Sequence, residues 1–207
     1  MNKNEKFVIT INREFGSGGH AIGLELANRL GVGFIDRQVI AAVAEKFNIT
    51  EEEAKVIERK RPAWWNDFTQ FYRSFMTMNE YRVDYKDITS RQLYYAQSAI
   101  MRNIADKESC IVIGRCGFDV FKDYANTLKI FLHSPLEKRV KRIMDLYKVD
   151  EDKARFMIED NDYTREVYTK TFTKKDRYDS RNYDLSLDVG NFGVNGAVDF
   201  LMKFIDV

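Results

Sequence analysis

The stretch REFGSGGHAIG, Arg13–Gly23, decides the fold of this 207-residue chain. It follows the apolar run FVITI (7–11) and precedes LELANRL (24–30), so a strand-like segment passes through a glycine-rich turn into a helix-like one. Glycines allow positive φ and let an anion approach the backbone N–H groups, and the start of a helix adds partial positive charge. This order predicts a loop that cradles phosphate. The competing interpretation is a glycine-rich turn that binds no ligand.

The turn lacks the lysine of the phosphate-binding pattern GxxxxGK[ST]. When Gly18 is aligned with the last glycine of the pattern, Arg13 takes the place of the first glycine and Gly19 that of the lysine. His20 follows at the Ser or Thr position of the pattern, and Ala21 falls where a Mg²⁺-binding threonine is expected, so neither side chain offers a hydroxyl. The predicted cradle consists of Arg13, Gly16, Ser17, Gly18, Gly19, His20 and Ala21. Glu14 precedes the glycines, and two roles stay open for it: assisting a metal, or an ion pair with Arg13.

Composition indicates one globular domain and excludes several classes of protein. The chain is 44% hydrophobic and 14% aromatic with a net charge of +1, so no global charge points to nucleic acid or an anionic membrane. The apolar run near the N-terminus is too short for a signal peptide or a membrane span. Cys110 and Cys116 have neither zinc nor CxxC spacing, which favours reduced structural thiols and a cytoplasmic location.

Five short apolar runs alternate with helical patterns and predict strands at 7–11, 33–35, 110–113, 128–132 and 185–189. Helices between buried strands favour a parallel sheet covered on both faces. Gly31 is expected to end the first helix, and Ser134-Pro135-Leu136-Glu137 and Thr50–Glu53 are expected to start two others as capping boxes. An aromatic, helical insert at about 62–86 is interpreted first as packing, with a homodimer face or a cover over a substrate as alternatives.

Three distant segments together resemble the cytidylate kinase-like family. ITINREFGSGGHAIGLELANRLGVGFIDRQVI is similar to the opening of that family, which lacks the loop lysine. IVIGRCGFDVFKDYANTLKIFLHSPLEKRVKRI is similar to the GRD segment and the helix after it in cytidylate kinases, and NYDLSLDVGNFGVNGAVDFL to their terminal strand. The resemblance implies an α/β fold of the P-loop NTPase type, with a parallel five-stranded sheet flanked by helices. It also implies one kinase-like domain over 1–207 with a helical lid at about 139–180.

On the acceptor side, the resemblance implies roles for two segments. Arg115 matches the arginine of GRD, while Cys116 stands where that motif has aspartate, so recognition of cytosine loses a contact. The structural alternative for Arg115 is an ion pair. Asp36 matches the first residue of an acceptor-binding motif whose remainder is absent, or it caps a helix; Arg37 beside it is a phosphate contact.

In the lid, Asp162 and Arg165 match a D-x-x-R pair of the relatives. Residues three apart share one helix face, so the aspartate can hold the arginine over a ligand. Arg139 and Arg142 have the same spacing on the preceding helix. Arg165, Arg142 and Arg115 are the predicted catalytic arginines, and Asp162 is placed with the acceptor contacts. A solvated, ion-paired helix pair is the competing interpretation.

The resemblance implies a kinase that moves the γ-phosphoryl of ATP, with Mg²⁺, to CMP or another small acceptor. Its expected partners are nucleotides, with no nucleic acid and no membrane. Gly19 and Ala21 favour the alternative of a weak or inactive nucleotide-binding sensor or scaffold. A purely structural interaction protein is the poorest hypothesis, because it leaves the loop, Arg115 and the Asp162–Arg165 pair unexplained.

Overall fold

The computed structural model describes residues 1–36 and 88–205. The chain forms two compact units, one of Met1–Asp36 with Arg102–Val207 and the other of Arg37–Met101. The predicted aromatic insert, the capping box at Thr50 and Arg37 lie outside the described residues. Everything that follows about the sheet and the candidate site concerns the first unit.

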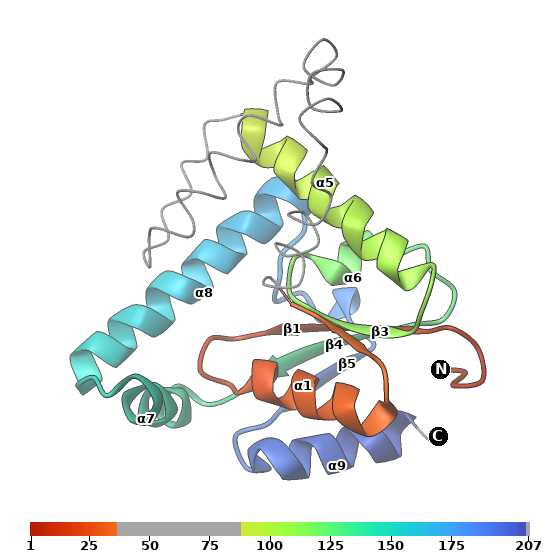
Figure 1. The fold of residues 1–207 in the computed structure, drawn as a ribbon. Coiled ribbons are helices and arrows are strands. Elements are labelled where there is room, and N and C mark those ends of the chain that lie inside the picture. The colour runs from red at the N-terminus through yellow and green to blue at the C-terminus, as the bar shows by residue number, and fades with distance from the viewer. Residues whose placement is uncertain (37–87, 206–207) are drawn as a thin grey trace, which may run out of the picture. The chain divides into compact units, whose positions relative to one another are not determined.

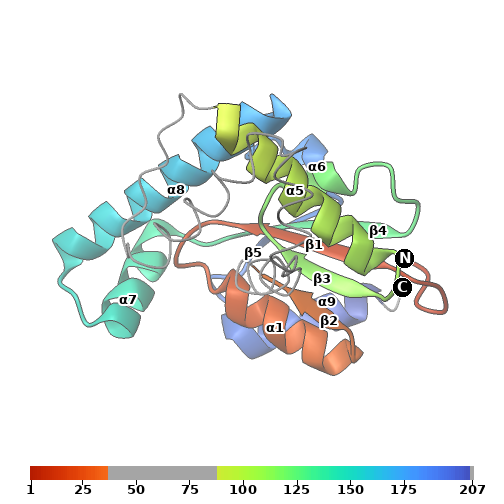
Figure 2. The ribbon, with the colours of Figure 1, turned by 45° about the horizontal axis from the view of Figure 1, so that its top comes forward.

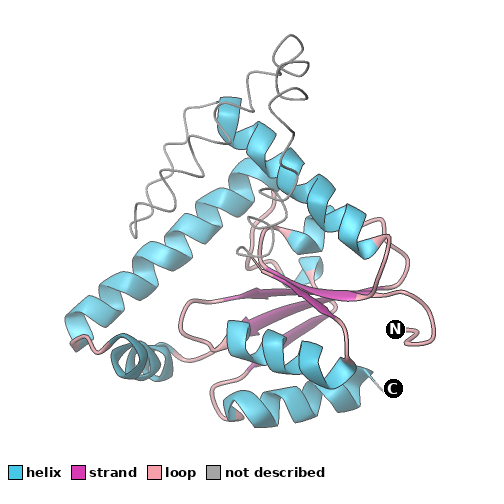
Figure 3. Ribbon diagram, viewed as in Figure 1, coloured by secondary structure: helices cyan, strands magenta, loops and turns pink. Residues whose placement is uncertain are grey.

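A five-stranded parallel sheet, as predicted, forms the centre of the first unit (Figures 1 and 3). Its order is β2-β3-β1-β4-β5, so the strand before the glycine-rich loop lies in the middle. The strands are β1 Val8–Arg13, β2 Gly33–Ile35, β3 Cys110–Ile113, β4 Thr127–His133 and β5 Leu185–Asp188. Because all run the same way, their carboxyl ends meet at one edge, where ligands bind in open α/β sheets.

The central strand is apolar on both faces because helices cover both. Ile9 pairs in register with Ile111 on one side and Leu128 on the other, and Ile9 and Ile111 are fully buried. β1 runs to Arg13, two residues beyond the predicted strand. Arg13 therefore begins from a fixed sheet position rather than from a loose loop.

Helices α1 Gly19–Leu30 and α9 Gly193–Ile205 lie side by side on one face of the sheet (Figures 1 and 2). The short α6 Gly117–Val120 packs on β1 and β4 from the other face. Gly31 ends α1 in a left-handed conformation, as predicted, and Val32 N–H donates to Ala27 O. Helix α5 Ile88–Ala105 joins the first unit at Arg102.

Helices α7 Leu136–Tyr147 and α8 Glu151–Thr173 follow β4 and pack on each other, with a 3-10 turn, η1 Ser180–Asn182, before β5. Their contact is a small apolar cluster of Val140, Ile143, Ala154 and Ile158. These elements span the predicted lid region, and Asp150 caps α8 by accepting from Lys153 N–H.

The capping box predicted at Ser134 is wrong. Helix α7 begins at Leu136 after Pro135, and no side chain caps it. The backbone of Ser134 serves tertiary contacts instead: its N–H donates to Glu14 Oε2 at 3.1 Å, and its carbonyl accepts from Arg139 Nε at 3.0 Å. None of the described helices is long and apolar enough to cross a membrane.

Candidate functional site

The glycine-rich loop joins the end of β1 directly to the first turn of α1. Gly16 has φ 83° and Gly18 φ 88°, left-handed values that favour glycine. Gly18 is the N-cap of α1, and no side chain caps the helix. The first N–H groups of an α-helix have no partner within the helix, so this start presents donors and partial positive charge to an anion.

Two of the loop glycines lie against helix α7. A Cβ placed on Gly16 would come within 3.0 Å of Arg139 Cβ and 3.1 Å of Arg139 O. A Cβ on Gly18 would lie 2.9 Å from Cζ of Arg142, so the Arg142 guanidinium lies over the loop. The Arg142 side chain thus lies close to the glycine-rich loop, and its predicted catalytic role stays a prediction.

Arg13 passes across two further glycines at this edge, Gly19 and Gly114. A Cβ on Gly19 would lie 2.8 Å from both Cβ and Cγ of Arg13. A Cβ on Gly114, which follows β3 with φ 70°, would collide with Arg13 Nη1 and lie 3.5 Å from Cζ. The side chain therefore runs from the first turn of α1 to the end of β3.

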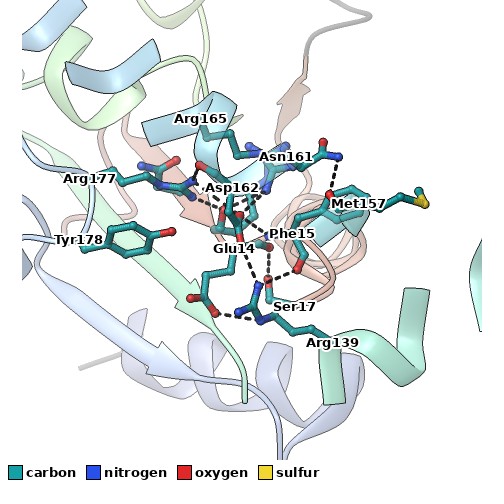
Figure 4. A network of polar contacts seen from close by, with 12 residues as sticks. Glu14, Phe15, Ser17, Arg139, Met157, Asn161, Asp162, Arg165, Arg177 and Tyr178 are labelled. Carbon is teal, nitrogen blue, oxygen red and sulfur yellow. Dashed lines mark hydrogen bonds and ion pairs between the residues drawn. The ribbon is translucent and has the colours of Figure 1, made fainter. Parts of the chain in front are cut away.

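The carboxylate of Asp162 is the centre of a polar network on the lid side of the loop (Figure 4). Its Oδ1 accepts from Phe15 N–H at 2.8 Å, and its Oδ2 lies 2.7 Å from Arg139 Nη1. Nη1 of Arg165 is 3.5 Å from Oδ1, as the spacing of three predicts, and Nη1 of Arg177 is 3.6 Å from it. Both oxygens thus have partners within the protein; the predicted contact of Asp162 with an acceptor stays a prediction.

Two guanidiniums from the lid region converge on the carbonyl of Arg13. Arg177 Nη2 donates to it at 2.6 Å and Arg165 Nη1 at 3.2 Å. Arg177 is fully buried, its Nη1 also donates to Asp162 O, and its Nε has no hydrogen-bond partner. Arg165 also lies over the ring of Phe15, 5.3 Å from its centroid. Helix α8 and the segment after it therefore hold the end of β1 directly.

Sequence reasoning missed the structural part of this network. Arg177 lies in the run KKDRYDSR, which reads as solvated, and no local pattern marks it as buried. Of the two roles left open for Glu14, the ion pair exists but with another residue: its Oε2 lies 3.3 Å from Arg139 Nε. Tertiary contacts bring the side chain of Arg139 to the carboxyl end of β1. The position of Arg139 in the helical pattern of the sequence does not reveal these contacts.

Arg115 leaves the carboxyl end of β3, as predicted, in a strained turn. Arg115 and Cys116 have φ 52° and 55°, rare values for residues with a side chain. The Arg115 guanidinium lies 5.7 Å from the centroid of Tyr168 and has no ion pair with a described side chain, so the structural alternative finds no support there. Burial raises the pKa of the Cys116 thiol to about 12, and its sulfur lies 3.9 Å from Thr169 Oγ1.

The positive charge around Arg13 is incompletely neutralised. Burial lowers its pKa well below the ordinary value, and the guanidiniums of Arg165, Arg177 and Arg115 lower it further, in that order. Burial, followed by Arg177, lowers the pKa of Arg165 to about 10. Within the described ranges, Arg13, Arg115 and Arg142 have no carboxylate at ion-pair distance. A group of guanidiniums that lower each other's pKa favours binding of an anion.

His20 and Asp36 form a pair on the β2 side of the loop. His20 Nε2 lies 3.2 Å from Asp36 Oδ2, and the imidazole meets the ring of Phe34 edge-on. Ala21 follows in α1 and offers no hydroxyl. The predicted contacts of His20, Ala21 and Asp36 with nucleotide or acceptor stay predictions, as does that of Arg37.

A family model described as the cytidylate kinase-like family matches residues 8–191, nearly the whole chain. The chain belongs to the cytidylate kinase-like family. The match spans the glycine-rich loop, the turn at Arg115 and the Asp162 network. No curated protein matches the sequence.

Solved structures show that the cytidylate kinase-like chain has a P-loop kinase fold. An uncharacterized protein from Eubacterium ventriosum is 25% identical with a TM-score of 0.71, over 97% of this chain and 98% of its own. Shikimate kinase from Bacteroides thetaiotaomicron is 15% identical with a TM-score of 0.51, over 97% and 99%. TT1252 from Thermus thermophilus is 16% identical with a TM-score of 0.51, over 97% and 96%. The predicted fold class is confirmed.

Proposed function

We propose that this protein is a phosphotransferase of the nucleoside monophosphate kinase type, which moves the γ-phosphoryl of ATP to CMP or another small acceptor. The single observation that carries the proposal is the uncapped start of α1 beside Arg13, Arg115 and Arg142, three guanidiniums without a carboxylate partner among the described residues. Backbone donors and unpaired guanidiniums in one place suit a polyphosphate.

The phosphates of ATP would bind at the loop rather than at the groove on the other side of Asp162. That groove, of about 560 Å³, is lined by the carboxylates of Glu14, Glu159, Asp162 and Glu166, which outnumber its two guanidiniums, Arg139 and Arg155. The loop side instead offers the N–H groups of the first turn of α1 and the guanidinium of Arg142 over Gly18. Of these two places, the loop side is the more favourable for the triphosphate.

The residues of the chain act by positioning and by neutralising charge. In phosphoryl transfer the bond between the γ-phosphorus and the oxygen bridging to the β-phosphate breaks, and a bond to an acceptor oxygen forms. Arg13 extends from the loop toward Gly114, which precedes Arg115. A phosphoryl donor at the loop and an acceptor at Arg115 would therefore meet beside the guanidinium of Arg13. Arg165, held by Asp162 and the Arg13 carbonyl, adds charge there without needing to reorganise.

Mg²⁺ is expected to accompany ATP, but the described residues do not fit a cage made by the protein alone. No three His, Cys, Asp or Glu side chains gather around one point in those ranges, and Ala21 lacks the hydroxyl of the usual pattern. Mg²⁺ at such sites is commonly held by substrate phosphates with one or two carboxylates.

The turn after β3 bears on which acceptor the protein uses. Cys116, a buried neutral thiol, stands where the related GRD motif has a carboxylate, so one contact to a cytosine amino group is missing. We include CMP because of the family, and uncharged or phosphorylated metabolites because of this departure. A cytoplasmic location, where thiols stay reduced, is part of the same proposal, since Cys110 and Cys116 are both free and buried.

The test is turnover by the purified full chain with Mg·ATP and a panel of nucleoside monophosphates and small hydroxyl acceptors, following ADP. Release of ADP that depends on one acceptor supports the proposal. Tight ATP binding without turnover on any acceptor would instead favour the sensor or scaffold, which Gly19 and Ala21 suggest. Absence of nucleotide binding would contradict both.

A further inference from the structure

Gly19 is a glycine for a reason different from that of its neighbours. Gly16 and Gly18 have positive φ, which disfavours any side chain, but Gly19 is the first residue of helix α1 and does not. Its backbone would accept a side chain without strain. What prevents one is Arg13, whose Cβ and Cγ lie 2.8 Å, and Cδ 3.6 Å, from the position of a Cβ on Gly19. Real Cβ atoms do not approach carbon so closely.

Gly19 also occupies the position at which a phosphate-binding loop carries its lysine. The stem of Arg13 thus fills the space that such a lysine stem would need at its base. Only one of the two side chains fits. The sequence shows both halves of this exchange, since Arg13 stands where the pattern has its first glycine and Gly19 where it has lysine.

The guanidinium of Arg13 ends close to the reacting region proposed above. It lies against Gly114, the residue before Arg115, where a side chain at position 114 would collide with it. Its backbone is fixed by β1 and by the hydrogen bonds from Arg165 and Arg177 to its carbonyl. A charged group held on a strand in this way needs little reorganisation to meet an anion.

We propose that Arg13 replaces the missing loop lysine and binds the phosphates of the nucleotide from the end of β1 instead of from helix α1. This inference rests on the proposed function, because it assigns a role within the same site. Arg13 has no carboxylate at ion-pair distance among the described residues, so its charge is available to phosphate. Its planar fork can grip two phosphate oxygens at once, whereas a lysine offers a point charge.

The alternative role for Arg13 is that of a spacer between α1 and the end of β3. A spacer would act through the bulk of its stem and not through its charge. Arg13→Met keeps most of the stem and removes the charge, so it separates the two roles. Arg13→Ala combined with Gly19→Lys tests the exchange directly, because removing the arginine stem clears the space for a lysine on the helix.

The experiment measures binding of ATP and of inorganic tripolyphosphate to the full chain by calorimetry, with thermal unfolding of each variant alongside. We expect Arg13→Met to weaken tripolyphosphate binding by about 10-fold or more, the effect of one charge-assisted hydrogen bond, at an unfolding temperature close to that of the wild type. Gly19→Lys alone should lower the unfolding temperature, since the two stems collide. The double variant Arg13→Ala/Gly19→Lys should bind tripolyphosphate more tightly than Arg13→Ala.

Two results would overturn the assignment: wild-type affinity in Arg13→Met, or a double variant that binds no better than Arg13→Ala. If a variant fails to fold, the other of the two comparisons still decides. The readout is independent of turnover. Wild-type protein that binds tripolyphosphate but transfers no phosphoryl group refutes the proposed activity and leaves this inference to the variants, while wild-type protein that binds neither ligand overturns both.

Discussion

Two sets of arginines lie near the carboxyl end of β1, and they differ in what neutralises them. Arg139 and Arg177 are buried and turned inward, toward Asp162, Glu14 and backbone carbonyls. Arg13 and Arg142 lie against the glycines and Arg115 follows Gly114 at the end of β3; none of the three has a carboxylate partner in the described ranges. The first set holds the loop through contacts within the protein, and the second would meet an anion under the proposed function.

The difference also separates stability from function. Removing one partner of a buried ion pair leaves an uncompensated charge in a medium that solvates it poorly, which is costly. Removing a partly exposed arginine with no partner changes little in the free protein and much in a complex with phosphate. Each arginine can therefore be assigned by which of the two quantities its removal changes.

The largest effect is expected for Asp162→Asn. Asparagine can still accept from Phe15 N–H, but it leaves Arg139, Arg165 and Arg177 without their shared negative charge. We expect a loss of about 3–5 kcal/mol in the free energy of unfolding, measured by urea denaturation. Asp160→Asn, on the exposed side of the same helix, is the matched control. Equal stability of the two variants would show that the charge of Asp162 does not hold the buried arginines in place.

Arg165 is intermediate between the two sets, because it pairs with Asp162 as the first set does but also lies beside the loop, over the ring of Phe15. If its charge acts on the transition state, Arg165→Ala should lower kcat by about 100-fold or more, the usual loss for one preorganised donor. The Kd for ATP should change much less. Steady-state kinetics with calorimetric Kd values check this. A loss confined to the Kd would place Arg165 in ground-state binding.

Among the arginines without a carboxylate partner, Arg115 should contact the acceptor, and the others should contact the phosphoryl donor. We expect Arg115→Ala to weaken acceptor binding by about 10- to 100-fold, the worth of a charge-assisted contact, with a far smaller change for ATP. Arg115→Lys should recover part of the acceptor affinity, since it restores charge without the planar fork. Equal losses for ATP and acceptor would contradict the assignment.

Arg142 provides the cleanest example of an unpaired guanidinium over the loop. Arg142→Ala should weaken ATP binding by about 10-fold and leave the free energy of unfolding within about 0.5 kcal/mol of the wild type. Lys141→Ala, its exposed neighbour on α7, controls for the general loss of one positive charge. If both variants weaken ATP binding equally, the position of Arg142 over Gly18 has no special role.

The smallest effect concerns Cys116, beside Arg115. Because burial raises the pKa of its thiol to about 12, the thiolate is scarce near neutral pH and grows only as the pH rises toward that value. We expect no labelling by iodoacetamide at pH 8 in the folded protein and rapid labelling in urea. Mass spectrometry of the peptide that contains Cys116 measures this; fast labelling of the folded protein would show that the turn after β3 opens readily.

Much of the fold could be predicted because its signals are local. FVITI, CIVI and LKIFL are short, largely apolar and rich in β-branched or aromatic residues, which favours buried strands, and Gly31 ends α1 by a conformation that suits glycine. The loop was predictable for the same reason, since its glycines and the following helix are contiguous. The prediction of a capping box at Ser134 was wrong because the backbone N–H and carbonyl of this residue form other hydrogen bonds.

Local sequence patterns could not predict which arginines of the site are paired with carboxylates or carbonyls. Whether an arginine is paired depends on residues more than a hundred positions away, as with Arg177 and the carbonyl of Arg13. The local pattern KKDRYDSR has the same composition whether it is solvated or buried. The spacing of Asp162 and Arg165 predicted their pairing but not the two further arginines that share the carboxylate.

The most direct measurement for the central claim is the Kd of the wild-type chain for ATP, compared with AMP, across a series of KCl concentrations. If unpaired guanidiniums and backbone donors hold the phosphates, ATP should bind far more tightly than AMP, and its affinity should fall steadily as salt screens the charges. Equal affinity for ATP and AMP, or an ATP affinity independent of salt, would contradict the account.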